Sequence, residues 1–293
     1  MANILVAGAG VVGTAVGHGF SQHEHKITFV DPDAEARRRV GELGFVAVEP
    51  DDVSLADIDV VFVAVSAPTG EQGVDTACLR MATRTLGEAL TRGFRTRYPV
   101  IVYRCTVPPG TTRILSKLLE AVSGLRAGVH FGVAYSPEYL RAESAHEDFL
   151  HPDVTTVGVI GDDERTWRIV RDLYQHFSCP LARVSPEDAE FQKYVHNLFN
   201  AVKISFFNEM RTTAGHLGIR DVDDLFLITA RSAEGMRNPL YGIADLGPYG
   251  GSCLPKDVAA WLLEMAQRSI ESPMVAAAQA VNRRTGNSQV RCR

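Results

Sequence analysis

The first 180 residues alternate between short apolar runs and longer stretches whose apolar positions have helical spacing. Residues 60–65 read VVFVAV and contain no polar side chain. A strand that is apolar on both faces is typical of a parallel sheet covered by helices on both sides. Further strands are expected at 4–7, 26–30, 99–103, 133–135 and 155–159, with helices at 76–92, from about 111, and at 163–177. The pattern predicts an α/β fold, a Rossmann-type doubly wound parallel sheet.

After residue 186 the pattern becomes helical. One amphipathic run, 188–210, is longer than an average helix and is expected to form the spine of a second domain. A shorter helix is predicted at 221–233, and a last helix should run from Ser272 to 283 before a polar tail, 285–293. We therefore expect an NAD-binding Rossmann-like domain at 1–183 and a mainly α-helical central domain at 184–293.

A glycine-rich turn, 8–13, connects the first strand to a helix that opens at Thr14. Glycines there permit a tight turn and the close approach of a pyrophosphate, which the helix N-terminus then stabilises. The second strand ends at Asp31, an acid that would bond a ribose 2′-hydroxyl and repel a 2′-phosphate, so NAD is favoured over NADP. The alternative is a glycine-rich turn in some other α/β protein. The candidate cofactor contacts are Gly8, Gly10, Val11, Val12, Gly13, Asp31, Ser66, Pro68 and Thr106.

The stretch GGSCLPKD, residues 250–257, has the features of a nucleophile placed at the start of a helix. Two glycines allow a turn, Ser252 or Cys253 can cap the helix, and Pro255 suits its first turn. The helix dipole and Lys256 both favour a thiolate at Cys253. Asp257 lies one turn further on, within reach of the sulfur or of a water. The stretch predicts a cysteine for covalent catalysis; the alternative is a buried structural cysteine.

Four polar residues elsewhere are placed by the pattern where they could contact a ligand. Lys193 and Asn197 are four apart in the long helix and share a face, where they could bond the oxygen of a reacting carbon. The alternative for both is solvent exposure. Thr106 and Glu138 should lie on loops at the carboxyl edge of the sheet, where ligands bind. Their alternatives are a turn hydroxyl and a solvated loop acid.

Composition excludes several classes of protein. Of the 293 residues, 45% are hydrophobic and 22% charged, as in soluble globular proteins. The net charge of −5 gives no broad basic field for nucleic acid or anionic lipid, and no apolar run approaches the ~20 residues of a membrane span. Five scattered cysteines without a Cys-x-x-Cys pair fit a reduced, cytoplasmic protein. The nine histidines show no metal-ligand spacing, so no metal site is predicted, and His18, His146 and His196 are assigned to the surface or to packing.

Taken together, these motifs resemble the UDP-glucose/GDP-mannose dehydrogenase family from residue 1 to about 284. The resemblance implies a four-electron oxidation of a sugar primary alcohol to a carboxylate with two NAD reduced. It implies that Cys253 attacks the aldehyde, that Lys193 and Asn197 stabilise the oxyanion, and that Asp257 acts as a base or holds a water. Glu138 and Thr106 would serve the water and proton transfers.

The resemblance also implies a substrate site and a homodimer built on the long helix, with Arg237 reaching the substrate of the partner subunit. The chain departs from the family at Ala142, Pro248 and in the expected absence of a third, nucleotide-gripping domain. Two alternatives therefore stay open: a two-electron alcohol dehydrogenase or reductase on a non-standard substrate, and a non-catalytic NAD-binding subunit. The implied substrate contacts are Glu138, Tyr139, Leu140, Arg141, Lys193, Asn197, Arg237, Tyr249 and Gly250.

Overall fold

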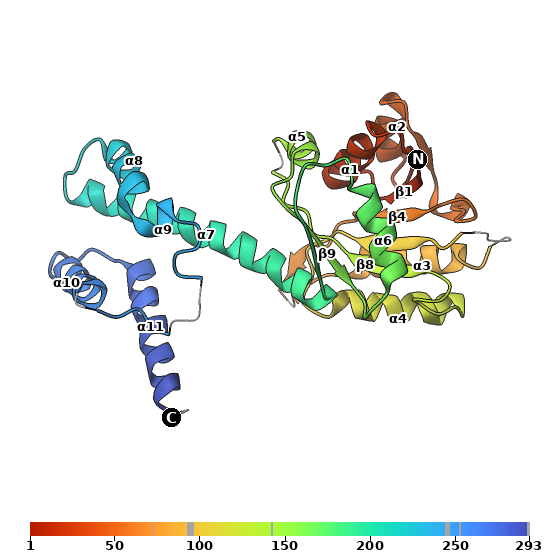
Figure 1. Ribbon diagram of the computed structural model, residues 1–293. Coiled ribbons are helices and arrows are strands. Elements are labelled where there is room, and N and C mark those ends of the chain that lie inside the picture. Colours follow the sequence, from red (N-terminus) through yellow and green to blue (C-terminus); the bar gives the residue numbers. More distant parts are fainter. Residues whose placement is uncertain (72, 93–96, 142, 244–246, 252, 292–293) are drawn as a thin grey trace. The chain divides into compact units, whose positions relative to one another are not determined.

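The computed structural model describes the chain except at residues 72, 93–96, 142, 244–246, 252 and 292–293 (Figure 1). It divides into two compact units, residues 1–196 and 197–293. The long helix α7 (Pro186–His216) begins in the first unit and continues into the second. The predicted domain boundary at 183/184 stays a prediction.

The first unit is built on a mostly parallel sheet, as predicted. In the described residues this sheet has eight strands in the order β10-β9-β8-β7-β4-β1-β2-β3, and β8 and β9 are the neighbours that run antiparallel. A two-stranded hairpin, β5 (Thr69–Gly70) and β6 (Gly73–Val74), follows β4. The strands of the main sheet are β1 (Asn3–Ala7), β2 (Lys26–Val30), β3 (Val46–Val48), β4 (Val60–Val63), β7 (Val100–Tyr103), β8 (Gly132–Tyr135), β9 (Thr155–Val159) and β10 (Leu181–Val184).

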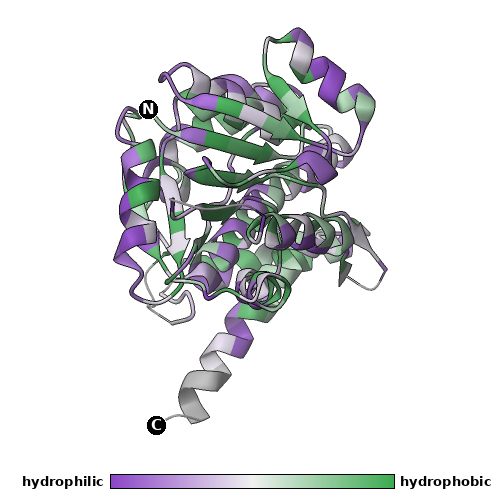
Figure 2. Ribbon diagram, turned by 90° about the vertical axis from the view of Figure 1, so that its right-hand side faces the viewer, coloured by the Kyte–Doolittle hydropathy of each residue, from purple (hydrophilic) through white to green (hydrophobic). Residues whose placement is uncertain are grey.

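Helices cover both faces of this sheet because its strands are apolar on both sides. Along β1, Ile4 and Val6 pack in one core cluster while Leu5 and Ala7 pack in the other. The first cluster includes residues of α1 (Val11–Ser21), α2 (Ala34–Glu42), α5 (Ala145–Leu150) and α6 (Glu164–Leu173). The second includes residues of α3 (Ala77–Ala89), α4 (Thr111–Ser123) and the start of α7. Figure 2 shows the hydrophobic strands between these helices.

The second unit consists of helices in the part of the chain that is described. After α7 come α8 (Val222–Ser232), the short α9 (Glu234–Arg237), α10 (Leu254–Gln267) and α11 (Pro273–Arg291). Glu209 of α7 binds the beginning of α11 through two hydrogen bonds, from Ser272 Oγ at 2.8 Å and Met274 N at 2.6 Å. The carboxylate therefore caps a helix that Pro273 opens.

Some elements differ from the prediction. The polar tail at 285–293 is wrong as far as residue 291, because α11 continues to Arg291. Polar residues such as Arg and Gln have good helix propensity, and an internal glycine such as Gly286 costs only about 1 kcal/mol relative to alanine. The strands β3 and β10 and the helices α2 and α5 were not predicted. The antiparallel pair β8–β9 is the one departure from parallel pairing within the eight described strands of the main sheet.

Candidate active site

The predicted cofactor turn has the strand–turn–helix geometry expected of it. Gly8 has a φ of +104°, a conformation that other residues rarely adopt. A Cβ at Gly13 would lie 1.8 Å from the carbonyl oxygen of Gly8, so close packing requires glycine there. A Cβ at Gly10 would meet no atom within 4 Å. The fold itself therefore does not require glycine at position 10, and the open space there suits the approach of a phosphate.

That open space belongs to a cavity of about 780 Å³. Its wall includes Gly10, Val11 and Thr14 from the glycine turn and α1, together with residues 143–147 at the start of α5. A helix N-terminus that faces an open cavity is suited to the pyrophosphate of NAD. The residues present therefore fit the cofactor that the sequence predicts.

Two histidines of the cavity wall were missed as site residues. The rings of His18 and His146 lie 4.0 Å apart between centroids and meet at 90°. Burial and the neighbouring His146 lower the pKa of His18. Because the two residues are 128 positions apart in the sequence, no local spacing could have indicated the pair.

Asp31 follows β2 and lies beside the glycine turn, as predicted. Its Oδ2 accepts the N–H of Ala9 at 2.8 Å, and its Oδ1 accepts the N–H of Asp33 at 2.9 Å. These bonds hold the carboxylate at the position where it could bond a ribose hydroxyl. Ser66 and Pro68 follow β4 and are exposed at the same edge of the sheet.

The loops of Thr106 and Glu138 emerge side by side. β7 and β8 pair in parallel with Tyr103 opposite Tyr135, so both loops leave the carboxyl edge of the sheet. This part of the prediction is confirmed. The Glu138 carboxylate does not turn to solvent, because its Oε2 accepts the N–H of Leu140 at 2.7 Å.

Lys193 connects the long helix α7 to the carboxyl edge of the sheet. It is 3% exposed, so the alternative of a solvated lysine is wrong. Its ammonium lies 3.1 Å from Glu138 Oε1 and also donates to the carbonyl oxygen of Glu138. The ammonium lies 5.5 Å from the ring centre of Tyr139. The buried Lys193 and the half-buried Glu138, which the sequence places in separate motifs, thus form an ion pair.

His196 lies one turn after Lys193 and was not predicted as a site residue. Its ring centroid is 4.8 Å from that of Tyr139. Burial and the nearby Lys193 ammonium lower the pKa of His196.

The loop after Glu138 is fixed by side chains. The hydroxyl of Tyr139 donates to Gln192 of α7 and lies 3.0 Å from Thr156 Oγ1. Arg141 binds Asp148 of α5 through its backbone N–H and two guanidinium nitrogens, the shorter at 2.6 Å. Ala142 lies outside the described residues.

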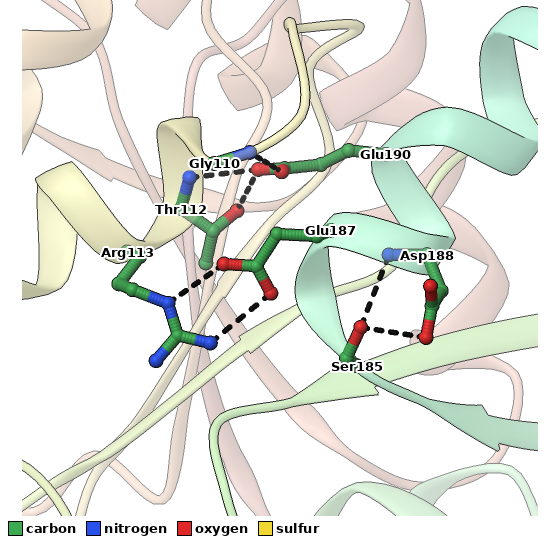
Figure 3. A network of polar contacts seen from close by, with 7 residues as sticks. All are labelled: Gly110, Thr112, Arg113, Ser185, Glu187, Asp188 and Glu190. Carbon is green, nitrogen blue, oxygen red and sulfur yellow. Dashed lines mark hydrogen bonds and ion pairs between the residues drawn. The ribbon is translucent and has the colours of Figure 1, made fainter.

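Sequence reasoning also missed Glu190. This glutamate is fully buried, and its carboxylate accepts hydrogen bonds from Gly110 N, Thr112 N and Thr112 Oγ1 at 2.5 to 2.7 Å (Figure 3). Burial raises its pKa, while the bonds from Thr112 and Gly110 oppose the shift.

In the second unit Cys253 occupies the predicted position. It is the N-cap residue of α10, and its carbonyl oxygen accepts the N–H of Asp257 at 2.9 Å. The residue is exposed, so the alternative of a buried structural cysteine is wrong. Lys256 Nζ lies 2.5 Å from Asp257 Oδ1, so these two charged groups pair with each other. Ser252, the other predicted cap, lies outside the described residues.

Cys105, next to Thr106, is a different kind of thiol. It donates to the carbonyl oxygen of Val65 at 3.0 Å, and burial raises its pKa to about 12. It is therefore held as the neutral thiol, which is a poor nucleophile.

The second unit has a cavity of its own, of about 1060 Å³. Two predicted substrate contacts, Tyr249 and Gly250, line it beside Leu254 and residues of α11. Asn282 of α11 donates to the carbonyl oxygen of Tyr249 at 3.0 Å. The buried hydroxyl of Tyr249 has no hydrogen-bond partner among the described residues.

Arg237 and Asn197, two more predicted substrate contacts, do not line this cavity. Arg237 ends α9 and pairs with Glu234 at 2.6 Å. Asn197 is exposed on α7, one turn after Lys193.

Two further features are absent from the described residues. His, Cys, Asp and Glu side chains do not gather there in a group of three or more that could hold a metal ion. None of the helices in that part of the chain combines the length and the apolar character that crossing a membrane requires.

Comparison with curated proteins identifies relatives over most of the chain. A putative UDP-glucose 6-dehydrogenase of Bacillus subtilis (strain 168) is 32% identical over 301 residues, which cover 95% of this chain and 67% of that protein. A GDP-mannose 6-dehydrogenase of Pseudomonas aeruginosa is 32% identical over 259 residues, covering 86% of this chain and 58% of that protein. The chain thus spans about three fifths to two thirds of the length of these relatives.

Solved structures give the same result. A GDP-mannose dehydrogenase from Pseudomonas aeruginosa, determined as a ternary complex, matches with a TM-score of 0.88 and 27% identity over 96% of this chain and 68% of that one. A UDP-glucose dehydrogenase from Pyrobaculum islandicum matches with a TM-score of 0.73 and 28% identity over 97% of this chain and 68% of that one.

Family models cover both units in order. Residues 50–178 match the NAD binding domain of the UDP-glucose/GDP-mannose dehydrogenase family, and residues 187–284 match its central domain. Because these matches cover most of the chain and agree with the sheet, the glycine turn and the relatives, the protein belongs to the UDP-glucose/GDP-mannose dehydrogenase family and carries its NAD-binding domain.

Proposed function

We propose that this chain catalyses the NAD-dependent oxidation of a sugar-nucleotide primary alcohol to the carboxylate, with Cys253 as nucleophile. The ion pair of the buried Lys193 with the half-buried Glu138 at the carboxyl edge of the sheet is the observation that supports this best. It supplies a base and a fixed positive charge at the edge of the sheet where ligands of such folds bind. NAD, when bound, supplies the acceptor for hydride in each of two oxidations.

In the first oxidation the primary alcohol loses a proton from oxygen and a hydride from carbon, which leaves an aldehyde. Lys193 and Asn197 stabilise the negative charge that develops on that oxygen. Preorganised donors of this kind typically contribute about 3–4 kcal/mol to a transition state. Thr106 and Glu138 hold the water or the hydroxyl that carries the proton away.

In the second oxidation the Cys253 sulfur bonds to the aldehyde carbon and forms a thiohemiacetal. Loss of a second hydride from that carbon gives a thioester. Water, deprotonated with the help of Glu138 and Asp257, attacks the thioester and releases the carboxylate and the thiol. In sum, one alcohol, one water and two NAD give one carboxylate, two NADH and three protons.

The substrate and the assembly are part of the same proposal. Relatives of this chain are named for UDP-glucose and GDP-mannose, so we propose a nucleotide sugar of this class as substrate. Tyr249 and Gly250 line the cavity of the second unit and would contact it. We further propose a cytoplasmic homodimer in which Arg237 serves the partner's substrate.

The test is the ratio of NADH formed to sugar consumed, measured with UDP-glucose and with GDP-mannose. A ratio near two, with acid as the product, is expected for the wild-type chain. Cys253→Ala should stop acid formation, whereas Cys78→Ala, which removes another exposed cysteine, should not. A ratio near one with aldehyde released, or full acid formation by Cys253→Ala, would overturn the proposal. NAD binding with no turnover of either sugar would leave a binding subunit.

A further inference from the structure

Helix α4 begins without a side chain of its own to cap it. Its N-cap residue is Gly110, with a φ of +94°, and glycine offers no acceptor. The first N–H groups of a helix lack partners within the helix and must find them elsewhere. Here the acceptor comes from 78 residues further along the chain, from Glu190 of α7.

The contact is buried and made by several bonds. The Glu190 carboxylate binds Gly110 N at 2.5 Å, Thr112 N at 2.7 Å and Thr112 Oγ1 at 2.6 Å, and the residue has no exposed surface. A charged acceptor at the positive end of a helix is favourable. Figure 3 shows the carboxylate facing the first turn of α4.

A second bridge between the same two helices is exposed. Arg113 of α4 pairs with Glu187 of α7 at 2.7 Å, with side-chain exposures of 48% and 33%. Exposed ion pairs contribute little to stability. Glu187 therefore offers a matched control for Glu190: the same residue type, on the same helix, bound to the same turn of α4.

The segment that Glu190 holds is the end of the Thr106 loop. That loop leaves β7 at Tyr103 and enters α4 at Thr111. One turn after Glu190, the same helix carries Lys193, which binds Glu138 on the neighbouring loop. Both loops proposed to carry catalytic residues are thus tied to a single stretch of α7.

We propose that Glu190 is a positioning residue that sets the Thr106 loop in register with Lys193 and Glu138. The proposal rests on the function proposed above, because it assumes that this loop borders bound NAD and the reacting carbon. Glu190 itself contacts neither the cofactor nor the sugar in this account.

The first experiment needs no turnover. Glu190→Gln keeps the size of the side chain but turns an amide N–H₂ toward backbone N–H donors, so at least one of the three bonds is lost. We expect hydrogen exchange at Gly110 and Thr112 to accelerate ~10-fold or more and the Kd for NAD, measured by calorimetry, to rise ~10-fold. Glu187→Gln should change either quantity by less than ~2-fold.

A smaller change guards against misfolding of the glutamine variant. Thr112→Val removes the hydroxyl donor and leaves both backbone bonds to Glu190, so it should move exchange and NAD affinity in the same direction by ~3-fold. If both Glu190→Gln and Thr112→Val bind NAD and exchange like the wild type, the proposal is wrong.

The second experiment separates positioning from a loss of folded protein. A sample with fewer folded molecules shows a lower kcat but an unchanged isotope effect. With UDP-glucose or GDP-mannose deuterated at C6, Glu190→Gln should show a larger kinetic isotope effect on kcat than the wild type, because a displaced loop slows hydride transfer itself. An unchanged isotope effect with a lowered kcat would assign Glu190 to stability alone.

The two proposals fail in different ways. If the wild type oxidises neither sugar but Glu190→Gln still weakens NAD binding, the positioning of the Thr106 loop by Glu190 is supported and the proposed function is wrong. If the wild type oxidises a sugar and Glu190→Gln matches Glu187→Gln in exchange, affinity and isotope effect, the function holds and the positioning role falls.

Discussion

At the scale of single residues, two glycines of the cofactor turn have different reasons to be glycine. A Cβ at Gly13 would collide with the backbone of Gly8, whereas a Cβ at Gly10 would enter open space at the cavity. Gly13→Ala should therefore lower the thermal midpoint or prevent folding. Gly10→Ala should fold like the wild type and raise the Kd for NAD ~10-fold or more, because the methyl group occupies space needed by the pyrophosphate.

Calorimetry with NAD and thermal unfolding of both variants make this check. Gly41→Ala is a suitable control, since a Cβ there also meets nothing within 4 Å and the residue lies in α2, outside the cavity wall. If Gly10→Ala binds NAD like Gly41→Ala, the pyrophosphate does not approach the turn at Gly10.

Lys193 supports a second prediction at this scale. The residue is buried, and its ammonium donates to the backbone carbonyl oxygen and to Oε1 of Glu138. Lys193→Met removes the charge but keeps the aliphatic stem, so kcat should fall ~10²–10³-fold through loss of oxyanion stabilisation. The exposed Lys117 of α4 provides the control, since Lys117→Met should leave kcat within ~2-fold. Steady-state rates of NADH formation decide the matter; equal rates for the two variants would exclude Lys193 from the chemistry.

At the scale of elements, α7 uses acidic side chains to hold other helices. Glu190 caps α4 in the first unit, and Glu209 caps α11 in the second through Ser272 and Met274. Ser272 in turn accepts a hydrogen bond from Trp261 of α10 at 3.0 Å. Glu209→Ala should therefore destabilise the second unit by about 1–3 kcal/mol.

Denaturant unfolding followed by tryptophan fluorescence reports on this contact, because Trp261 belongs to the network. Glu271→Ala, one residue before Ser272 and exposed, is the control and should be neutral within ~0.5 kcal/mol. Equal midpoints for the two alanine variants would mean that Glu209 does not stabilise α11.

The loop between Glu138 and α5 supports a prediction about pH. Contacts with Arg141 hold the pKa of Asp148 well below its usual range. A carboxylate whose pKa is lower in the folded state stabilises the fold above its unfolded pKa, and the contribution is lost as the pH falls through the folded pKa. Thermal midpoints of the wild type should therefore exceed those of Asp148→Asn at neutral pH, and the difference should shrink below about pH 4. A difference independent of pH would show that the charge of Asp148 is not responsible.

The elements that sequence patterns predicted are those with a strong local signal. β4 is buried on both faces and stands out as an apolar run, and the glycine turn is identified by its own residues. β3 is an apolar run of only three residues, and β10 has four residues that include Arg183, so both runs are too short to stand out, and both strands are only partly buried. The end of α11 was misplaced because polar residues are as compatible with a helix as with a loop, so the polar run gave no signal for where the helix ends.

The candidate site follows the same rule. Cys253, Asp31 and Glu138 were found because each sits in a short motif whose local geometry follows from its residues. Glu190 was missed because its partners are 78 and 80 positions away. One indirect signal existed: the sequence Pro-Pro-Gly-Thr-Thr opens a helix at a residue with no side-chain acceptor, so a partner from elsewhere in the chain was required.

At the scale of the whole molecule, the second unit leaves much apolar surface uncovered. Leu198, Phe199 and Val202 of α7 are 55–61% exposed, and Leu227 and Ile228 of α8 are 62–63% exposed. Large apolar side chains that stay exposed on neighbouring turns of one helix, as Leu198, Phe199 and Val202 do, suit an interaction surface. Because a two-fold dimer buries the same patch on both copies, these helices suit the predicted homodimer.

Sedimentation tests that assembly directly. We expect a mass near twice the 32.0 kDa of one chain at micromolar concentration. Phe199→Asp places a charge in the proposed interface, and its dimer Kd should rise ~100-fold or more, which leaves a species near 32.0 kDa. Val129→Asp, at a position in the first unit that is 55% exposed, should keep the dimer. Because Arg237 is proposed to serve the partner's substrate, Phe199→Asp should also lose sugar oxidation while it still binds NAD. A monomeric wild type would exclude the homodimer, and a Phe199→Asp variant that stays dimeric would place the contact outside this part of α7.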